Sequence, residues 1–190
     1  MPPPPPSFRM SWMLKLRIAT AADVPLILQL IRDLAEYERE PQAVVAAEQD
    51  LLRDGFDADP KFHVIIAEWD GAAAGFAFYF YHYSTWLGRA GIFLEDLFVK
   101  PELRGKGIGK TLLAELAKIA VENDYYGVKW EVLDWNQPAI DFYESLGAQV
   151  RRAWLPVRIT GEPLHKLAAQ SPKAAGSTSA GSHNSRTDSA

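Results

Sequence analysis

The stretch Leu94–Leu113, LEDLFVKPELRGKGIGKTLL, sets the architecture of this chain. Its first residues are apolar apart from Glu95 and Asp96, a composition typical of a buried strand. Pro101 ends that strand, because proline has no N–H group to give to a sheet. A glycine-rich turn, Arg104–Lys110, comes next, and leucines then recur at helical spacing. The stretch therefore predicts a strand, a glycine turn and a helix in direct succession.

This succession predicts a binding site for an anion. The first turn of a helix leaves backbone N–H groups unpaired, and the helix dipole adds positive potential at the same end. Glycines allow a ligand to approach the backbone closely. A diphosphate is therefore the expected guest of the turn.

Glycine spacing distinguishes three kinds of phosphate-binding turn. A Walker-type nucleotide loop needs a glycine, four further residues and then Gly-Lys-Ser/Thr, but this chain has Arg104 at the first position before Gly109-Lys-Thr. The dinucleotide fingerprint G-x-G-x-x-G fails at Lys110. The pattern Arg-x-x-Gly-x-Gly/Ala is met by Arg104, Gly107 and Gly109. It resembles the coenzyme A pyrophosphate loop of the GCN5-related N-acetyltransferases, the GNAT family.

Composition excludes several other classes of protein. The 190 residues are 48% hydrophobic, enough for one domain with a core. A net charge of −4 provides no basic face for a nucleic acid. The chain has no cysteine, and its four histidines lack metal-ligand spacing, so no metal is expected. There is no secretory signal and no apolar run long enough to span a membrane, so a cytoplasmic protein is the default expectation.

The chain divides into three parts by composition. Residues 1–13 are expected to be a flexible proline-rich extension and 170–190 a disordered low-complexity tail, while 14–169 have the composition of a folded domain, which the resemblance implies is an N-acetyltransferase domain. Within the domain, strands are predicted at 14–18, 62–68, 73–83, 91–99 and 127–133, with one or two more within 150–159. Helices are predicted at about 20–37, at 47–54, after the glycine turn, at 139–146 and at 161–169. This order predicts a mixed α/β sheet.

Transfer of an acyl group from a thioester to an amine needs a base, because an ammonium with a pKa of about 10 is no nucleophile. A carboxylate inside an apolar strand is costly unless it is paired or functional. Glu95 is the favoured base, directly or through a water, although Glu95 and Asp96 could each be a salt-bridged acid. The developing oxyanion also needs donors, for which the backbone of Leu97–Val99 is the candidate.

The departing thiolate benefits from an acid. Tyr143 lies seven residues after Asn136, a good N-cap, so both are expected on one face of the next helix. A phenol can protonate a thiolate. On the pattern alone, the neighbouring Phe142 and Tyr143 could equally be an aromatic pair of which one packs in the core.

The chain is similar to the GNAT family from about Leu14 to Ala169, and within it to the spermidine/spermine type of diamine N-acetyltransferase. The stretches that carry this likeness are Leu34-Ala-Glu-Tyr-Glu38, Asp50-Leu-Leu-Arg-Asp-Gly-Phe56, Tyr83-Ser-Thr-Trp86, Leu94-Glu-Asp96, Arg104–Gly109 and Trp135-Asn-Gln-Pro138 with Phe142-Tyr143. The resemblance implies a GNAT fold: a mixed, mostly antiparallel central sheet with a splayed strand pair and flanking helices. It also implies a homodimer that exchanges or pairs C-terminal segments.

The resemblance also implies a role for each matching residue. Tyr37 and Glu38 border the amine site, Glu95 handles the amine proton and Tyr143 protonates the thiolate. The residues implied to hold acetyl-CoA are Leu97, Phe98, Val99, Arg104, Gly105, Lys106, Gly107, Ile108, Gly109, Lys110 and Asn136. Acids and aromatics around the site, with Trp86 among them, suit a cationic amine through charge and cation–π contact.

One departure bears on the substrate. Polyamine-specific members carry an acid just before the tryptophan of the loop, whereas this chain has Ser84-Thr85 before Trp86, and the spacing from Trp86 to Leu94 is a residue longer. Both features favour the thialysine-acetylating branch, and a short diamine or a lysine analogue over a long polyamine. Acetylation of a protein lysine or N-terminus and a non-catalytic acyl-CoA-binding module remain alternatives.

Overall fold

The computed structural model describes residues 13–172. The expectations for residues 1–12 and 173–190 lie outside the described residues. The chain separates into two compact units, Met1–Asn136 and Gln137–Ala190, and each is described by itself.

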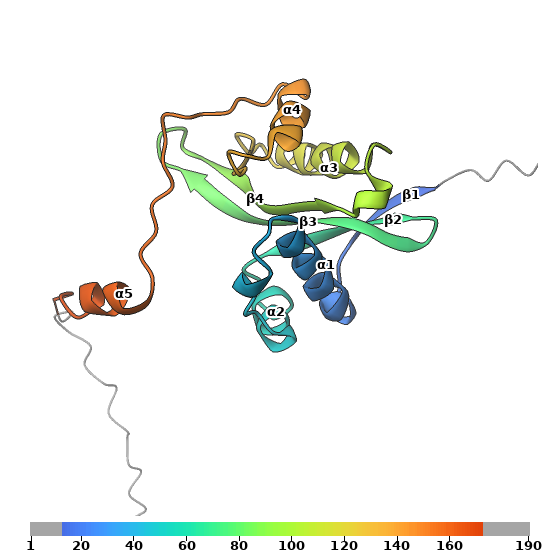
Figure 1. Cartoon of the computed structure of the whole chain (residues 1–190). Coiled ribbons are helices and arrows are strands. Elements are labelled where there is room, and N and C mark those ends of the chain that lie inside the picture. Colours follow the sequence, from blue (N-terminus) through green and yellow to red (C-terminus); the bar gives the residue numbers. More distant parts are fainter. Residues whose placement is uncertain (1–12, 173–190) are drawn as a thin grey trace, which may run out of the picture. The chain divides into compact units, whose positions relative to one another are not determined.

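The first unit is built on a five-stranded sheet with the strand order β1-β2-β3-β4-β5 (Figure 1). The strands are β1 (Leu14–Ile18), β2 (His63–Trp69), β3 (Ala72–Ser84), β4 (Arg89–Val99) and β5 (Val128–Trp130). Each of the first three strands pairs antiparallel with the strand that follows it, and β5 runs parallel to β4. This confirms the predicted mixed, mostly antiparallel sheet. The fifth strand is shorter than the predicted range 127–133.

Helices cover both faces of this sheet. Helices α1 (Val24–Tyr37) and α2 (Glu48–Gly55) lie on one face, and α3 (Ile108–Glu122) lies on the other (Figure 1). Single 3-10 turns, η1 (Ala21–Asp23), η2 (Pro41–Ala43) and η3 (Pro101–Leu103), stand between these elements. The predicted helices at 20–37 and 47–54, and the one after the glycine turn, are thereby confirmed.

The start of α1 is fixed by a charged network that also ties β1 to β2. The backbone N–H of Thr20 donates to Oδ2 of Asp23 at 2.8 Å, as in the predicted capping box. Arg17 donates two hydrogen bonds to the same carboxylate, and its Nε donates to Glu68 Oε1 at 2.6 Å. The hydrogen bonds from Arg17 hold the pKa of Asp23 far below its usual range.

The core on the α1 face joins alternate residues of three strands to one side of α1. Phe76, Phe98, Val64 and Ile66 lie in one buried cluster with the apolar residues of α1. Phe78 packs against the same cluster and is stacked on Phe62 at 4.2 Å between ring centroids. Period-two strands and a 3.6-period helix bury apolar residues in this way.

The pairing of β4 with β5 stops early. The ladder runs over three pairs only and ends at Leu94 opposite Trp130. From Glu95 to Val99, β4 keeps β3 as its neighbour on one side and has no β5 residue opposite it on the other. The two strands therefore separate beyond Leu94, and this separation is the splayed strand pair of the sheet.

The second unit contains α4 (Gln137–Ser145) and α5 (Gly161–Ala168), which confirms both predicted C-terminal helices. Gly147, with φ +87°, ends α4 as expected. The strands predicted within 150–159 are wrong: the described residues there form no strand. Apolar alternation defines one face of a strand, but a strand exists only with a hydrogen-bonded partner.

Candidate functional site

A β-bulge in β4 lies at the centre of the candidate site. Phe78 of β3 is opposite Asp96, and its neighbour Tyr79 is opposite Leu94, so Glu95 is an extra residue without a cross-strand partner. Adjacent residues on β3 point to opposite faces, and opposed residues share a face. Leu94 and Asp96 therefore face opposite sides of the sheet, although strict alternation would put them on the same side.

The bulge turns the carboxylate of Asp96 toward α1. Its partner Phe78 packs on the α1 core, and Glu38 directly follows the last residue of α1. Asp96 is half-buried. Burial and the negative charges of Glu95 and Glu38 raise the pKa of Asp96 to about 7. Asp96 therefore changes its charge near neutral pH.

Glu95 and Glu38 complete a group of three acids. Glu95 is more exposed than Asp96, and burial together with the charge of Glu131 raises its pKa. Burial also raises the pKa of Glu38. These three carboxylates carry no hydrogen bond or ion pair from any other residue in the described part of the chain. The group is therefore suited to a cationic guest.

Arg104, at the start of the glycine turn, reaches back to the end of α1. Its guanidinium carbon lies 4.1 Å from the ring centroid of Tyr37, and its Nε donates to the carbonyl oxygen of Val99 at 3.0 Å. The hydroxyl of Tyr37 donates to Oδ1 of Asn136 at 3.3 Å, and Asn136 is only 7% exposed. A chain of contacts thus connects Val99, Arg104, Tyr37 and Asn136, which were predicted for two different parts of the site.

The glycine turn itself has the backbone that a phosphate cradle needs. Gly105 and Gly107 have φ +75° and +83°, and Gly107 is the residue before the first residue of α3. A Cβ at either position would have no neighbour within 4 Å, so the backbone there is open to a ligand. The start of α3 adds N–H groups and the positive end of its dipole. These features fit the diphosphate of coenzyme A.

Other predicted members of this turn fall into two groups. Ile108, the first residue of α3, is buried and anchors the end of the turn in the core. Lys106 and Lys110 are exposed, and the ammonium of Lys106 lies 5.1 Å from the ring centroid of Trp69. Gly109 lies in the first turn of α3. The turn thus exposes its backbone and the ammonium groups of Lys106 and Lys110 to solvent, while Ile108 holds its end in the core.

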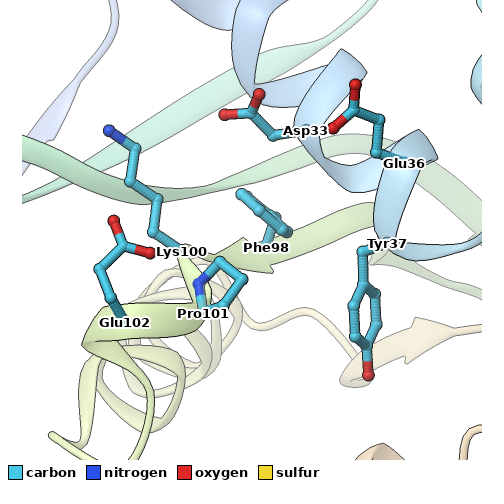
Figure 2. A pocket seen from close by; sticks show the side chains of 7 residues that line it. All are labelled: Asp33, Glu36, Tyr37, Phe98, Lys100, Pro101 and Glu102. Atoms are coloured by element: carbon cyan, nitrogen blue, oxygen red, sulfur yellow. The ribbon is translucent and has the colours of Figure 1, made fainter.

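A pocket of about 420 Å³ lies between the C-terminal half of α1 and the end of β4 (Figure 2). Its lining consists of Asp33, Glu36 and Tyr37 from α1 with Phe98, Lys100, Pro101 and Glu102 from β4 and η3. The lining contains three carboxylates and one ammonium, that of Lys100, so its net charge is negative. Tyr37 belongs both to this pocket and to the contact with Arg104, so the two adjoin.

Trp86 is a predicted site residue that is not brought to this place. Trp86 lies at the turn between β3 and β4 and is 87% exposed. Asp96 lies seven positions along β4 from the strand start at Arg89, a span of roughly 20 Å. Tyr143 lies on α4, in the second unit, with its ring 5.3 Å from that of Phe142.

The described residues contain no cluster of His, Asp or Glu that could hold a metal ion. Within the same residues, no helix has the length and apolar character required to cross a membrane.

Comparison with known proteins decides the family. The model of the acetyltransferase (GNAT) family matches residues 27–148, which include the bulge, the glycine turn and the whole of α4. The chain belongs to the GNAT family. It is an N-acetyltransferase, and the expected likeness to the thialysine branch is confirmed by the relatives that follow.

The thialysine N-epsilon-acetyltransferase of Bos taurus is 39% identical over 166 residues, which cover 82% of this chain and 97% of the bovine protein. The L-ornithine N5-acetyltransferase of Arabidopsis thaliana is 31% identical, over 80% of this chain and 87% of the plant enzyme. Among solved structures, an integron cassette protein from the mobile metagenome of V. cholerae has a TM-score of 0.69 at 29% identity. It covers 82% of this chain and 97% of its own.

The sequence alone missed the orientation of Asp96 and the stack of Arg104 on Tyr37. No local signal marks a β-bulge in LEDLFV, because every residue in it is compatible with a regular strand. An alignment of the apolar residues of β3 with those of β4 would have revealed that β4 has one residue too many, Glu95.

Proposed function

We propose that this enzyme transfers the acetyl group of acetyl-CoA to the primary amine of a small diamine or of a lysine analogue such as thialysine. The amine attacks directly within a ternary complex of enzyme, acetyl-CoA and acceptor. The observation that carries the proposal is the group of three carboxylates at the end of β4's pairing with β5. Two of the three, Glu95 and Asp96, lie on the strand that leads into the glycine turn.

The charge of the acceptor follows from these carboxylates. Glu38, Glu95 and Asp96 attract an ammonium group, and Tyr37 beside them offers an aromatic face. The pocket next to Tyr37 adds further negative charge for a second cationic group. Relatives named for thialysine and ornithine, which both carry a side-chain amine, support the same substrate class.

The donor is proposed to lie along β4 and over the glycine turn. The backbone of Leu97, Phe98 and Val99 has no β5 residue opposite it, which supports a role for this segment in binding the amides of the donor. Gly105–Lys110 would hold the diphosphate, with Arg104 and Asn136 at the border of the amine site. Bound there, acetyl-CoA supplies the thioester as an activated acyl group.

The chemistry proposed for the protein is proton transfer and orientation. A carboxylate of the pair Glu95–Asp96 takes the proton of the ammonium and thereby creates the nucleophile. Tyr143 gives a proton to the departing thiolate. Since both reactants are held together, much of the gain in rate comes from proximity. The chain has no cysteine, so no thiol acyl-enzyme is formed.

The protein is also proposed to work as a homodimer joined through its C-terminal segment. Leu155, Val157 and Ile159 alternate along the chain and are 83%, 94% and 47% exposed. Such a row is typical of a strand that lacks its partner. A second copy of this chain is the proposed partner that would cover this row.

The decisive experiment measures thiol release from acetyl-CoA with thialysine, ornithine, lysine, putrescine, spermidine and a histone-like peptide. We expect the amino-acid diamines and short diamines to turn over fastest. Mass spectrometry of the product identifies the acetylated nitrogen. Turnover of the peptide alone would favour the protein acetyltransferase. Coenzyme A binding without any turnover would favour the non-catalytic module.

A further inference from the structure

We infer that Arg39 forms a binding subsite for a carboxylate, and that the acceptor of the acetyl group is therefore an amino acid with a side-chain amine. The inference rests on the proposed function, whose donor and amine chemistry it keeps. It narrows the acceptor from small diamines in general to those that carry a carboxylate. Arg39 is then the residue that distinguishes these two kinds of acceptor.

The backbone of Arg39 has a conformation that glycine usually adopts. The N–H of Arg39 donates to the carbonyl oxygen of Glu36 at 3.1 Å, and the N–H of Glu40 donates to that of Ala35 at 2.9 Å. These two bonds form the Schellman motif that ends α1, and the motif needs a left-handed residue at the position of Arg39. Arg39 has φ +66°, which costs energy for a residue with a Cβ. A strained arginine at this point indicates a use for its side chain.

The guanidinium of Arg39 lies over an aromatic ring. Its central carbon is 5.0 Å from the ring centroid of Trp135, which is 45% exposed. A guanidinium held over a ring by its face can still donate from its edge, and that edge matches the two oxygens of a carboxylate. Within residues 13–172 no acid pairs with Arg39, whereas Arg17 and Arg53 each bind two acids. The cation of Arg39 is therefore available to a ligand.

The contact between Arg39 and Trp135 adjoins the proposed amine site at both ends. Trp135 directly precedes Asn136, whose Oδ1 accepts the hydroxyl of Tyr37 at 3.3 Å. Arg39 directly follows Glu38, one of the three carboxylates proposed to attract the amine. A single exposed cation thus lies at the border of an acidic group.

This distribution of charge matches an amino acid with two amines. Such a molecule carries a side-chain ammonium, an α-ammonium and a carboxylate. The three acids suit the side-chain ammonium, and the negative pocket beside Tyr37 suits the α-ammonium. Arg39 supplies the positive charge that the carboxylate needs. A diamine without a carboxylate would leave Arg39 unpaired and be repelled by it, so Arg39 favours the amino acid twice.

The test removes the charge of Arg39 and keeps the backbone conformation. Glycine and asparagine both tolerate a left-handed conformation, so Arg39→Gly and Arg39→Asn delete the guanidinium without new strain. Arg39→Lys keeps the positive charge but loses the planar edge. Arg53→Gln serves as the control, because Arg53 is an exposed arginine on α2 that pairs with Asp50 and Asp54.

Three acceptors that differ only at the carboxylate are compared with each variant. They are thialysine, its neutral amide and the diamine that remains when the carboxylate is removed. Steady-state assays give kcat/KM for each acceptor with acetyl-CoA. Calorimetry in the presence of coenzyme A gives the dissociation constant of each acceptor without any turnover, and the affinity for coenzyme A itself. Thermal unfolding gives the melting temperature of each variant.

The expected pattern is a loss of preference. The wild type should prefer thialysine to its amide at least about tenfold, in kcat/KM and in affinity, and Arg39→Gly and Arg39→Asn should reduce this preference to about twofold or less. In the same variants kcat/KM for the diamine should rise, since one cation fewer repels it. The preference of Arg39→Lys should be intermediate. Arg39→Gly should melt at or above the wild-type temperature, because its backbone strain is relieved, and Arg53→Gln should keep the full preference.

Two results would overturn the inference. One is a wild type that binds thialysine and its amide equally. The other is an equal loss for thialysine, its amide and coenzyme A in Arg39→Gly and Arg39→Asn, which would mean that Arg39 only holds Trp135 in place. Failure of the proposed function is a different result, in which no acceptor is acetylated at all. Calorimetry would then still decide whether a preference for the carboxylate exists and depends on Arg39.

Discussion

The guanidinium of Arg104 lies 4.1 Å from the ring centroid of Tyr37 and also donates through Nε to the carbonyl oxygen of Val99. This arrangement joins the end of α1 to the edge of β4 and to the first residue of the glycine turn. The proposed amine side and the proposed coenzyme side of the site therefore share one side chain.

Replacement of Arg104 by lysine is expected to separate these two sides. Lysine keeps the positive charge but loses the planar stack and the Nε hydrogen bond. We expect the KM for the amine to rise by about fivefold, with the affinity for coenzyme A changed less than about threefold. Steady-state kinetics and calorimetry measure the two quantities.

Two further variants serve as controls for Arg104. Tyr37→Phe retains the stack and loses only the hydrogen bond to Asn136, so its effect on the amine should be smaller. Lys106→Gln should weaken the binding of coenzyme A and leave the KM for the amine unchanged. If Arg104→Lys weakens coenzyme A most, Arg104 acts as a phosphate ligand and its link to Tyr37 is incidental.

Gly75 is expected to resist any side chain. It pairs with Val99, and a Cβ at Gly75 would lie 2.3 Å from the carbonyl oxygen of Phe98. Gly75→Ala should therefore destabilise the fold by about 1–3 kcal/mol, because backbone must move. Thermal unfolding should show a fall of several degrees. An unchanged melting temperature would mean that β3 and β4 separate there at little cost.

Asp96→Asn should change stability in a pH-dependent way. The pKa of Asp96 is about 7 in the folded protein and has the ordinary value of 3.8 in the unfolded chain. Between these pH values the folded protein therefore binds more protons than the unfolded chain does. Stability is then lost as the pH rises through this window. The variant should match wild type at pH 4 and melt roughly 5 °C or more higher at pH 8. Equal melting curves at pH 8 would contradict the raised pKa.

Tyr143→Phe should separate chemistry from binding. The phenylalanine keeps the ring that lies beside Phe142 and removes only the hydroxyl. If Tyr143 protonates the thiolate, kcat should fall on the order of 100-fold with little change in either KM. A thioester whose leaving thiol is more acidic should recover part of the loss. Unchanged turnover would remove Tyr143 from the mechanism.

Val157→Lys should disrupt the proposed dimer. Val157 is 94% exposed in the single chain, so a lysine there costs the monomer nothing by burial. In a dimer joined by this segment the charge would be buried, so the dissociation constant of the dimer should rise at least tenfold. Light scattering coupled to gel filtration measures the mass, with Lys166→Ala on α5 as a surface control. A monomeric wild type would refute the dimer.

Local chemistry accounts for most of what could be predicted. Pro101 ends a strand and the glycines at 105 and 107 permit positive φ wherever they occur, so the strand, turn and helix follow from neighbours in the chain. The apolar periods of 2 and 3.6 likewise indicate the sheet and α1. These signals act over a few residues, so they locate the coenzyme turn without reference to any distant contact.

Contacts between distant residues account for the rest. Tyr37 meets Asn136 across 99 positions of the chain, and Arg104 meets Tyr37 only because α1 and β4 pack on each other. The strands expected within 150–159 need a partner that their own pattern cannot supply.

The stretch from Leu94 onward shows what each kind of information determines. Its sequence predicts a buried strand that carries two acids and leads into a phosphate-binding turn. It does not specify which acid faces α1, because that depends on the register of β4 against β3. A single extra residue, Glu95, shifts this register and turns Asp96 to the other face. The side-chain period of a strand is two, so a slip of one residue reverses every direction beyond it.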